Sequence, residues 1–113
     1  RLTEEITRLQ GVTRHLLGIL ARGDAERACA DATLYLEQFG LVTIAWQWLK
    51  QAVVARRALV GCAPEGEEGA FYEGKLHTMK FFFHYELPKT LGLAARLTDP
   101  EALTLPTEAG VMI

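Results

Sequence analysis

The stretch FGLVTIAWQWL, residues 39–49, decides the fold of this chain. It would be apolar on nearly every side of a helix, because only Gly40, Thr43 and Gln47 interrupt it. A helix that is apolar all round is buried on several sides. The run is about 11 residues long, whereas a helix needs about 20 apolar residues to cross a bilayer. We therefore predict a central core helix, or a helix with one face in a protein–protein interface.

Helical patterns continue on the N-terminal side of this stretch. Residues 25–60 are predicted to form one long helix, with Asp24 as its N-cap. Residues 1–22 are predicted to form another, ended by Gly23, because glycine readily adopts the left-handed conformation found after helices. The apolar positions that repeat at helical spacing in this first helix are Leu2, Ile6, Leu9, Leu16, Leu17 and Leu20.

A third long helix is predicted over residues 67–96, after the turn-rich segment GCAPEGEEG at 61–69. Two adjoining stripes run along it: Tyr72, Leu76, Met79, Phe83 and Leu87, and then Phe71, Thr78, Phe82 and Tyr85. Pro88 predicts a kink, because its ring crowds the carbonyl group of His84 and it lacks an N–H group. Asp99-Pro100-Glu101 predicts the start of a short final helix.

These patterns predict an all-α fold, an antiparallel up-down bundle of three long helices plus a short C-terminal helix. Residues 1–113 are predicted to form a single helical domain, since 113 residues can bury a hydrophobic core. Half of the residues are apolar and 23% are charged, which is typical of a globular protein. The formal charge is −2 with both signs mixed, so we expect no nucleic-acid partner and no membrane partner.

The two cysteines, Cys29 and Cys62, lie near opposite ends of the predicted second helix. A straight helix would place them about 50 Å apart, whereas a disulfide needs Cα atoms within about 7 Å. We therefore expect reduced thiols in a cytoplasmic protein. Because the first residue is Arg1 rather than methionine, we also expect the chain to be a fragment, a processed product or a trimmed piece of a longer protein.

The histidines at 77 and 84 are weak candidates for a metal site. They are seven residues apart, which is about 10.5 Å along a helix, whereas zinc needs ligand nitrogens at about 2.0–2.1 Å. Glu73 and His77 have i, i+4 spacing, but two ligands do not make a site. A polar helix face formed by Glu73, His77, Lys80 and His84 is the preferred interpretation, and no metal site is predicted.

Catalytic groups are equally hard to assemble. His84, Tyr85 and Glu86 are neighbours in sequence, so on a helix they point about 100° apart and cannot converge on one substrate atom. Glu86 is better explained as a structural ion pair, with Lys89 or an arginine from another helix, than as a catalytic base. The chain has no serine and no glycine-rich phosphate loop. We assign no catalytic and no cofactor-binding residue.

Two longer stretches carry a family resemblance: YLEQFGLVTIAWQWLKQA at 35–52 and FYEGKLHTMKFFFHYELPK at 71–89. Together they resemble the C-terminal helical extension of bacterial acyl-CoA dehydrogenases, in the subgroup of 3-methylmercaptopropionyl-CoA dehydrogenase-like enzymes. The resemblance covers essentially the whole chain, and the second motif is quite specific. Thr78-Met79 departs from the smaller residues that the family usually has there.

The resemblance implies a parent enzyme that contains FAD and oxidises acyl-CoA to 2,3-enoyl-CoA. The flavin site and the glutamate that removes the α-proton belong to the dehydrogenase core, so it implies no cofactor and no catalytic residue in this chain. The implied partner is the dehydrogenase core of the same chain, with another subunit of a homo-oligomer as a further candidate. Acyl-CoA would be the substrate of the parent enzyme.

Two hypotheses follow. In the first, the chain is a non-catalytic helical domain that packs on the dehydrogenase core or between subunits. In the second, it is a free-standing helical interaction module with no enzyme activity. Large aromatic side chains are enriched at interfaces, so the candidate interface consists of Phe39, Trp46, Trp48 and Phe82.

Overall fold

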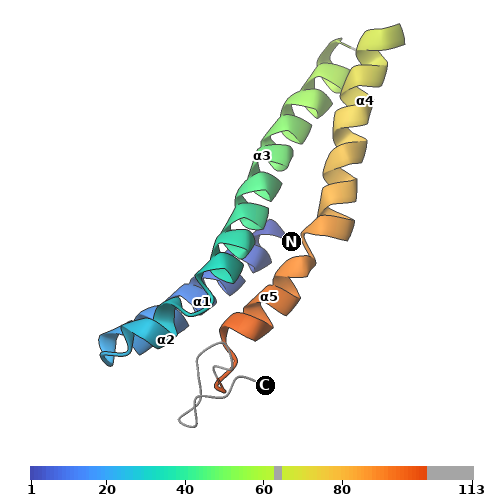
Figure 1. The fold of residues 1–113 in the computed structure, drawn as a ribbon. Coiled ribbons are helices and arrows are strands. Elements are labelled where there is room, and N and C mark those ends of the chain that lie inside the picture. Colours follow the sequence, from blue (N-terminus) through green and yellow to red (C-terminus); the bar gives the residue numbers. More distant parts are fainter. Residues whose placement is uncertain (63–64, 102–113) are drawn as a thin grey trace.

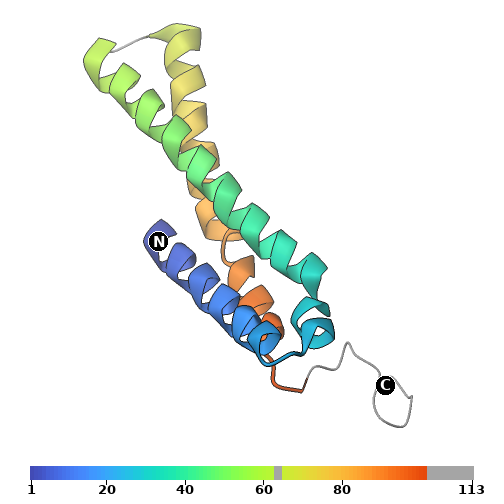
Figure 2. The same ribbon diagram turned by 90° about the vertical axis from the view of Figure 1, so that its left-hand side faces the viewer.

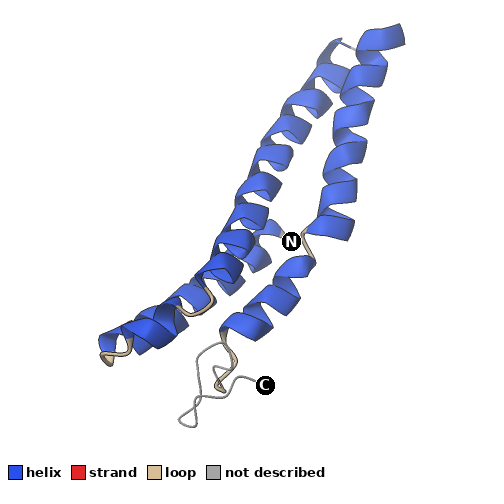
Figure 3. Cartoon of the chain, viewed as in Figure 1, coloured by secondary structure: helices blue, strands red, loops and turns tan. Residues whose placement is uncertain are grey.

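The computed structural model describes residues 1–62 and 65–101, and this part of the chain contains helices and no strand. In chain order the elements are α1 (Leu2–Ala21), α2 (Ala25–Cys29), α3 (Ala32–Cys62), α4 (Gly66–Phe81), the π-helix η1 (Phe82–Glu86) and α5 (Lys89–Leu97). Successive long helices run in opposite directions (Figures 1 and 3). The predicted all-α up-down fold with three long helices is therefore confirmed. The short helix expected after Asp99 lies almost wholly outside the described residues.

Helix α3 is the central element, because it contacts α1, α4, η1 and α5. With 31 residues it is about 46 Å long. Figure 2 shows that α1 covers only the half of α3 that follows α2. Beyond the N-terminus of the chain, α3 and α4 continue as a two-helix hairpin. One end of the molecule therefore has a third helix and the other end does not.

The molecule is elongated and flat. Its radius of gyration is 19.4 Å and its extents are 66 × 27 × 15 Å, whereas a compact chain of this length has a radius of gyration of about 13 Å. Several large apolar side chains are exposed, among them Leu36, Trp46 and Val60, so this layer of helices leaves apolar surface uncovered.

The main cluster of buried apolar residues lies where the middle of α3 meets η1. Its buried members are Ala45, Phe83 and Leu87, and half-buried residues pack against it: Leu2, Leu49, Met79 and Phe82. The predicted stripe from Tyr72 to Leu87 is confirmed, since all five of its members are buried or half-buried. In the adjoining stripe, Phe71 and Tyr85 are 60% and 69% exposed, so that stripe does not line the core.

The kink expected at Pro88 is confirmed, but the distortion begins six residues earlier. Residues Phe82–Glu86 form a π-helix, and the N–H group of Leu87 donates to the carbonyl oxygen of Phe82 at 2.8 Å. The i→i−5 bond replaces the α-helical pattern just before a residue that has no N–H group to donate. Helix α5 then begins at Lys89.

The apolar face predicted for the first helix was wrong. Helix α1 buries Glu5, Val12 and Ile19, which repeat every seven residues. Of the predicted positions, Leu2, Leu9 and Leu16 are only half-buried and Ile6, Leu17 and Leu20 are exposed. The buried face of α1 differs from the predicted one because Glu5 has hydrogen-bond partners inside the molecule. A charged residue therefore occupies a position that hydropathy assigned to solvent.

The single helix predicted over residues 25–60 was also wrong, because it is broken at Ala30 and Asp31 into α2 and α3. An aspartate is unfavourable inside a helix and favourable at its start, and the N–H group of Tyr35 donates to the carbonyl oxygen of Asp31 at 3.1 Å. The N-cap is confirmed, since the Asp24 carboxylate accepts a hydrogen bond from the N–H group of Arg27 at 3.0 Å.

The break does not bring the two cysteines together. Cys29 is exposed on α2, and Cys62 is the last residue of α3, whose length of about 46 Å separates them. An intrachain disulfide would require Cα atoms within about 7 Å. None of the described helices has the length and apolar character needed to span a membrane.

Gly23 joins α1 to α2 with a φ of +86°, as its predicted role requires. Replacing it by alanine should lower the free energy of unfolding by about 1 kcal/mol, because a Cβ atom is strained in the left-handed region. Gly11 is the matched control, since it lies inside α1 with open space around it. Gly11→Ala should raise the free energy of unfolding by about 0.5–1 kcal/mol. Urea titration measures both variants. Equal effects from both substitutions would contradict this interpretation.

Candidate functional site

The most extensive candidate site is an exposed apolar strip along α3. It consists of Leu36, Phe39, Trp46, Val53 and Val60, which are 69%, 50%, 49%, 43% and 75% exposed. The last four repeat every seven residues, which keeps them on one side of a helix. The ammonium group of Lys50 lies 4.7 Å from the centre of the Trp46 ring. The α3 strip is thus a row of exposed apolar side chains on one side of the helix, with the exposed Lys50 and Arg57 between its members.

The four aromatic residues predicted as an interface do not form one surface. Phe39 and Trp46 lie together in the α3 strip. Trp48 is about 200° around the helix from Trp46, is half-buried, and has the Lys75 ammonium group 5.5 Å from its ring centre. Phe82 is half-buried against the core cluster. The structure therefore brings together two of the four and directs the other two elsewhere.

A groove between α3 and α4 is the second candidate, and hydropathy along the chain did not reveal it. Its volume is about 430 Å³, and it is lined by Gln47, Lys50, Gln51, Val54, Ala55, Phe71, Tyr72 and Lys75. Val54 and Phe71 are 61% and 60% exposed. Phe71 belongs to the adjoining stripe predicted for the third helix, but the sequence pattern did not pair it with Val54. The α3–α4 groove and the α3 strip face different sides of α3, because Val54 and Val53 point about 100° apart.

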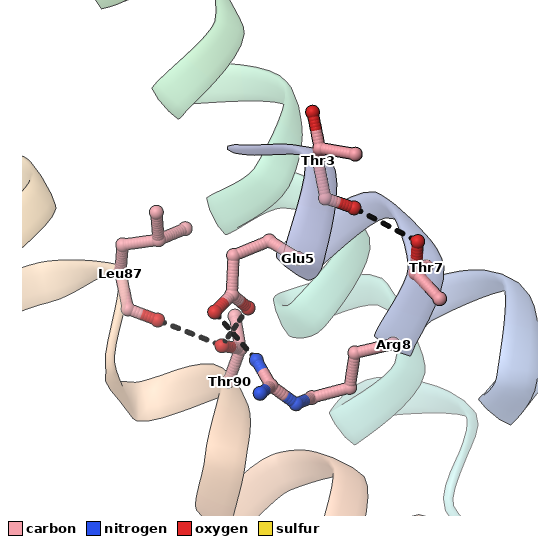
Figure 4. Close-up of polar contacts among 6 residues, drawn as sticks. All are labelled: Thr3, Glu5, Thr7, Arg8, Leu87 and Thr90. Carbon is pink, nitrogen blue, oxygen red and sulfur yellow. Dashed lines mark hydrogen bonds and ion pairs between the residues drawn. The ribbon is translucent and has the colours of Figure 1, made fainter. Parts of the chain in front are cut away.

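A buried carboxylate links α1 to α5 (Figure 4). Glu5 is only 8% exposed. Its carboxylate accepts hydrogen bonds from the Arg8 guanidinium group and from the Thr90 hydroxyl group. The same hydroxyl lies 2.8 Å from the carbonyl oxygen of Leu87, but it has one proton, and a carboxylate is the stronger acceptor. Because its oxygens are occupied by donors, Glu5 is suited to joining helices and not to accepting a substrate proton.

A second polar contact joins α1 to α3. The Thr13 hydroxyl donates to the carbonyl oxygen of Leu9 at 2.8 Å, so the Tyr35 hydroxyl donates to Thr13 at 2.7 Å. Gln38, on the same side of α3, is fully buried, and among the described residues neither its side-chain oxygen nor its nitrogen has a hydrogen-bond partner. Neither Glu5 nor Gln38 was identified from the sequence pattern.

The polar residues of the predicted third helix form an ion pair or are exposed to solvent. Glu86 and Lys89 form an ion pair at 2.7 Å, as predicted, and the hydrogen bond from Lys89 to this carboxylate raises the pKa of the ammonium group. His77 and His84 are exposed. Within residues 1–62 and 65–101, no three His, Cys, Asp or Glu side chains are grouped closely enough to hold a metal ion.

Comparison with known proteins complements this geometry. The family model described as "Acetyl-CoA dehydrogenase C-terminal like" matches residues 1–106. Comparison with the curated proteins and with the solved structures gives no significant match. The family match covers all of the described helices, including the α3 strip and the α3–α4 groove.

Proposed function

The chain belongs to the acetyl-CoA dehydrogenase C-terminal-like family, and from this premise we propose that it is the non-catalytic helical domain of an FAD-dependent acyl-CoA dehydrogenase. The parent enzyme would oxidise acyl-CoA to 2,3-enoyl-CoA and would belong to the 3-methylmercaptopropionyl-CoA dehydrogenase-like subgroup. The domain binds the dehydrogenase core of the same chain. We also propose a cytoplasmic location, in keeping with the free thiol of Cys29.

The α3 strip is the observation that carries this proposal. Trp46 and Phe39 are exposed and one heptad apart. Tryptophan is among the side chains most often found at the energetic centre of interfaces, and phenylalanine is enriched at interfaces. Lys50 and Arg57 lie between apolar members of the strip. Protein–protein interfaces commonly combine apolar and aromatic side chains with polar groups. We propose that Phe39 and Trp46 contact the core.

The residues that line the α3–α4 groove do not fit a flavin. A flavin pyrophosphate needs backbone N–H groups directed at it, usually from a glycine-rich turn at a helix start. The α3–α4 groove is lined by residues from the interiors of two helices, whose backbone N–H groups are used within those helices. We therefore assign flavin binding and proton abstraction to the dehydrogenase core and derive no chemical step from this chain.

The experiment uses the natural protein that contains these 113 residues. Its reading frame should encode a dehydrogenase core before Arg1, and the purified protein should show flavin absorbance. Trp46→Ala and Phe39→Ala should each increase the rate at which a protease releases the helical domain about tenfold, because each removes a contact worth about 1.4 kcal/mol. Leu91→Ala is the matched control, since Leu91 is 56% exposed on α5, outside the strip.

Three results would each contradict a part of the proposal. A reading frame that begins near Arg1 would favour a free-standing interaction module. Tight FAD binding by the 113-residue chain alone would show that the flavin site had been assigned to the wrong part of the protein. Equal protease sensitivity of the Trp46 and Leu91 variants would remove the α3 strip from the interface.

A further inference from the structure

We propose that the α3–α4 groove is a self-association surface through which two copies of this chain pair and form a four-helix bundle. The groove meets the α3 strip at Lys50, but the apolar members of the two surfaces point about 100° apart, so the inference does not depend on the assignment of the strip to the dehydrogenase core. It rests on the shape of the hairpin, on the exposed residues of the groove and on the arrangement of charge along α4.

The shape of the hairpin calls for a second layer. Beyond the N-terminal end of α1, α3 and α4 continue as a single layer of two helices (Figure 2). Stable domains bury apolar faces between two layers, and two hairpins packed face to face make a four-helix bundle. A stable pairing of this kind buries about 800 Å² on each partner.

The groove has both a projecting aromatic ring and a floor of small and flat side chains. Phe71 is 60% exposed and packs edge-on against Tyr72, with ring centres 5.5 Å apart. Ala55, on α3, is 1% exposed and forms part of the floor, and Val54 is 61% exposed beside it. A surface that carries a projection and a depression side by side can complement a second copy of itself across a two-fold axis.

Charge along α4 is antisymmetric about Phe71. Glu67 is four residues before it and Lys75 four residues after it, so all three lie on one face of the helix. Neither charge takes part in an ion pair within the described residues, and the Lys75 ammonium group instead lies 5.3 Å from the centre of the Phe71 ring and 5.5 Å from that of Trp48.

An antiparallel pairing of two α4 helices that cross at Phe71 therefore satisfies all three residues at once. It places the two Phe71 rings against each other on the two-fold axis. It also brings Glu67 of each copy opposite Lys75 of the other, which gives two ion pairs. A parallel pairing would place like charges together. The charge pattern thus selects a second copy of this chain, in one orientation, as the occupant of the groove.

Sedimentation equilibrium of the 113-residue chain tests the proposal. The wild-type chain should show a monomer–dimer equilibrium. Glu67→Lys and Lys75→Glu should each raise the dissociation constant about tenfold, because each replaces two attractions by two repulsions. The double variant with both substitutions should return it to within about twofold of wild type, since the pairs are restored with reversed sign. Residues eight apart on one helix do not contact each other, so this rescue cannot arise within a single copy.

Matched controls separate the groove from general effects of charge and hydropathy. Glu73→Lys makes the same charge change on another face of α4 and should alter the dissociation constant less than about twofold. Val54→Asp should weaken dimerisation strongly, whereas Val53→Asp, on the neighbouring α3 strip, should not. A wild-type chain that remains monomeric at millimolar concentration would overturn the proposal, and so would a double variant no stronger than the single variants. Loss of contact with the dehydrogenase core in the Glu67→Lys variant, without dimerisation in the wild type, would assign the groove to the core instead.

Discussion

Replacing Phe83 by alanine should lower the free energy of unfolding by about 3–5 kcal/mol. Phe83 is 8% exposed and forms the core cluster with Ala45 and Leu87. Its removal leaves a cavity where α3 meets η1, in a molecule too flat for other elements to move in and fill it. Domains of this size have a total stability of about 5–15 kcal/mol, so the variant should be unfolded at a much lower urea concentration than wild type.

Trp46→Ala is the informative comparison, because tryptophan is the larger side chain. Trp46 is 49% exposed, so its replacement should cost less than about 1 kcal/mol in the same titration. A loss of 3 kcal/mol or more at Trp46, at the scale of a fully buried aromatic residue, would show that the α3 strip is covered within the chain itself. It would then be unavailable to the dehydrogenase core. Circular dichroism as a function of urea measures both variants.

Replacing Gln38 by leucine should raise the free energy of unfolding by about 1–3 kcal/mol. Gln38 is 0% exposed, and its amide group has no hydrogen-bond partner among the described residues. An unsatisfied buried amide loses its hydration and gains nothing in return. Leucine has a similar size and needs no partner, so the substitution removes that penalty with little change in packing.

The exposed Gln10 of α1 provides the control for this gain. Gln10→Leu should change stability by less than about 0.5 kcal/mol, because Gln10 remains in water. A loss of stability in Gln38→Leu would mean that the amide group is satisfied by a polar partner beyond residues 1–62 and 65–101. It would also identify Gln38 as a residue that sets the alignment of α3 against its neighbours.

Local patterns predicted the third helix well. The stripe from Tyr72 to Leu87 is one face of a helix, and proline has a strong effect on the backbone around it, so both features follow from neighbouring residues. The π-helix was not predicted from the sequence, because an i→i−5 hydrogen bond depends on how the segment packs against neighbouring helices. The face of α1 was missed for a similar reason. Glu5 is buried because Thr90, 85 residues later, donates to it.

The interface residues show where sequence reasoning reached its limit. The heptad spacing of Phe39 and Trp46 already places them on one side of a helix. Composition alone grouped them with Trp48 and Phe82, although the direction of each side chain depends on where α4 lies against α3. The α3–α4 groove could not be predicted before those two helices were placed side by side, since it takes residues from both.

The π-helix at Phe82–Glu86 makes the length of this segment as important as its residues. Residues that follow it, among them Thr90, Leu93 and Leu97, are buried because the wide turn sets the rotation of α5 about its axis. Deleting one residue between 82 and 86 would rotate everything after it by about 100° and turn these side chains away from α1 and α3, which α5 contacts. Relatives should therefore tolerate insertions and deletions in the turn between α1 and α2 far more readily than in these five residues.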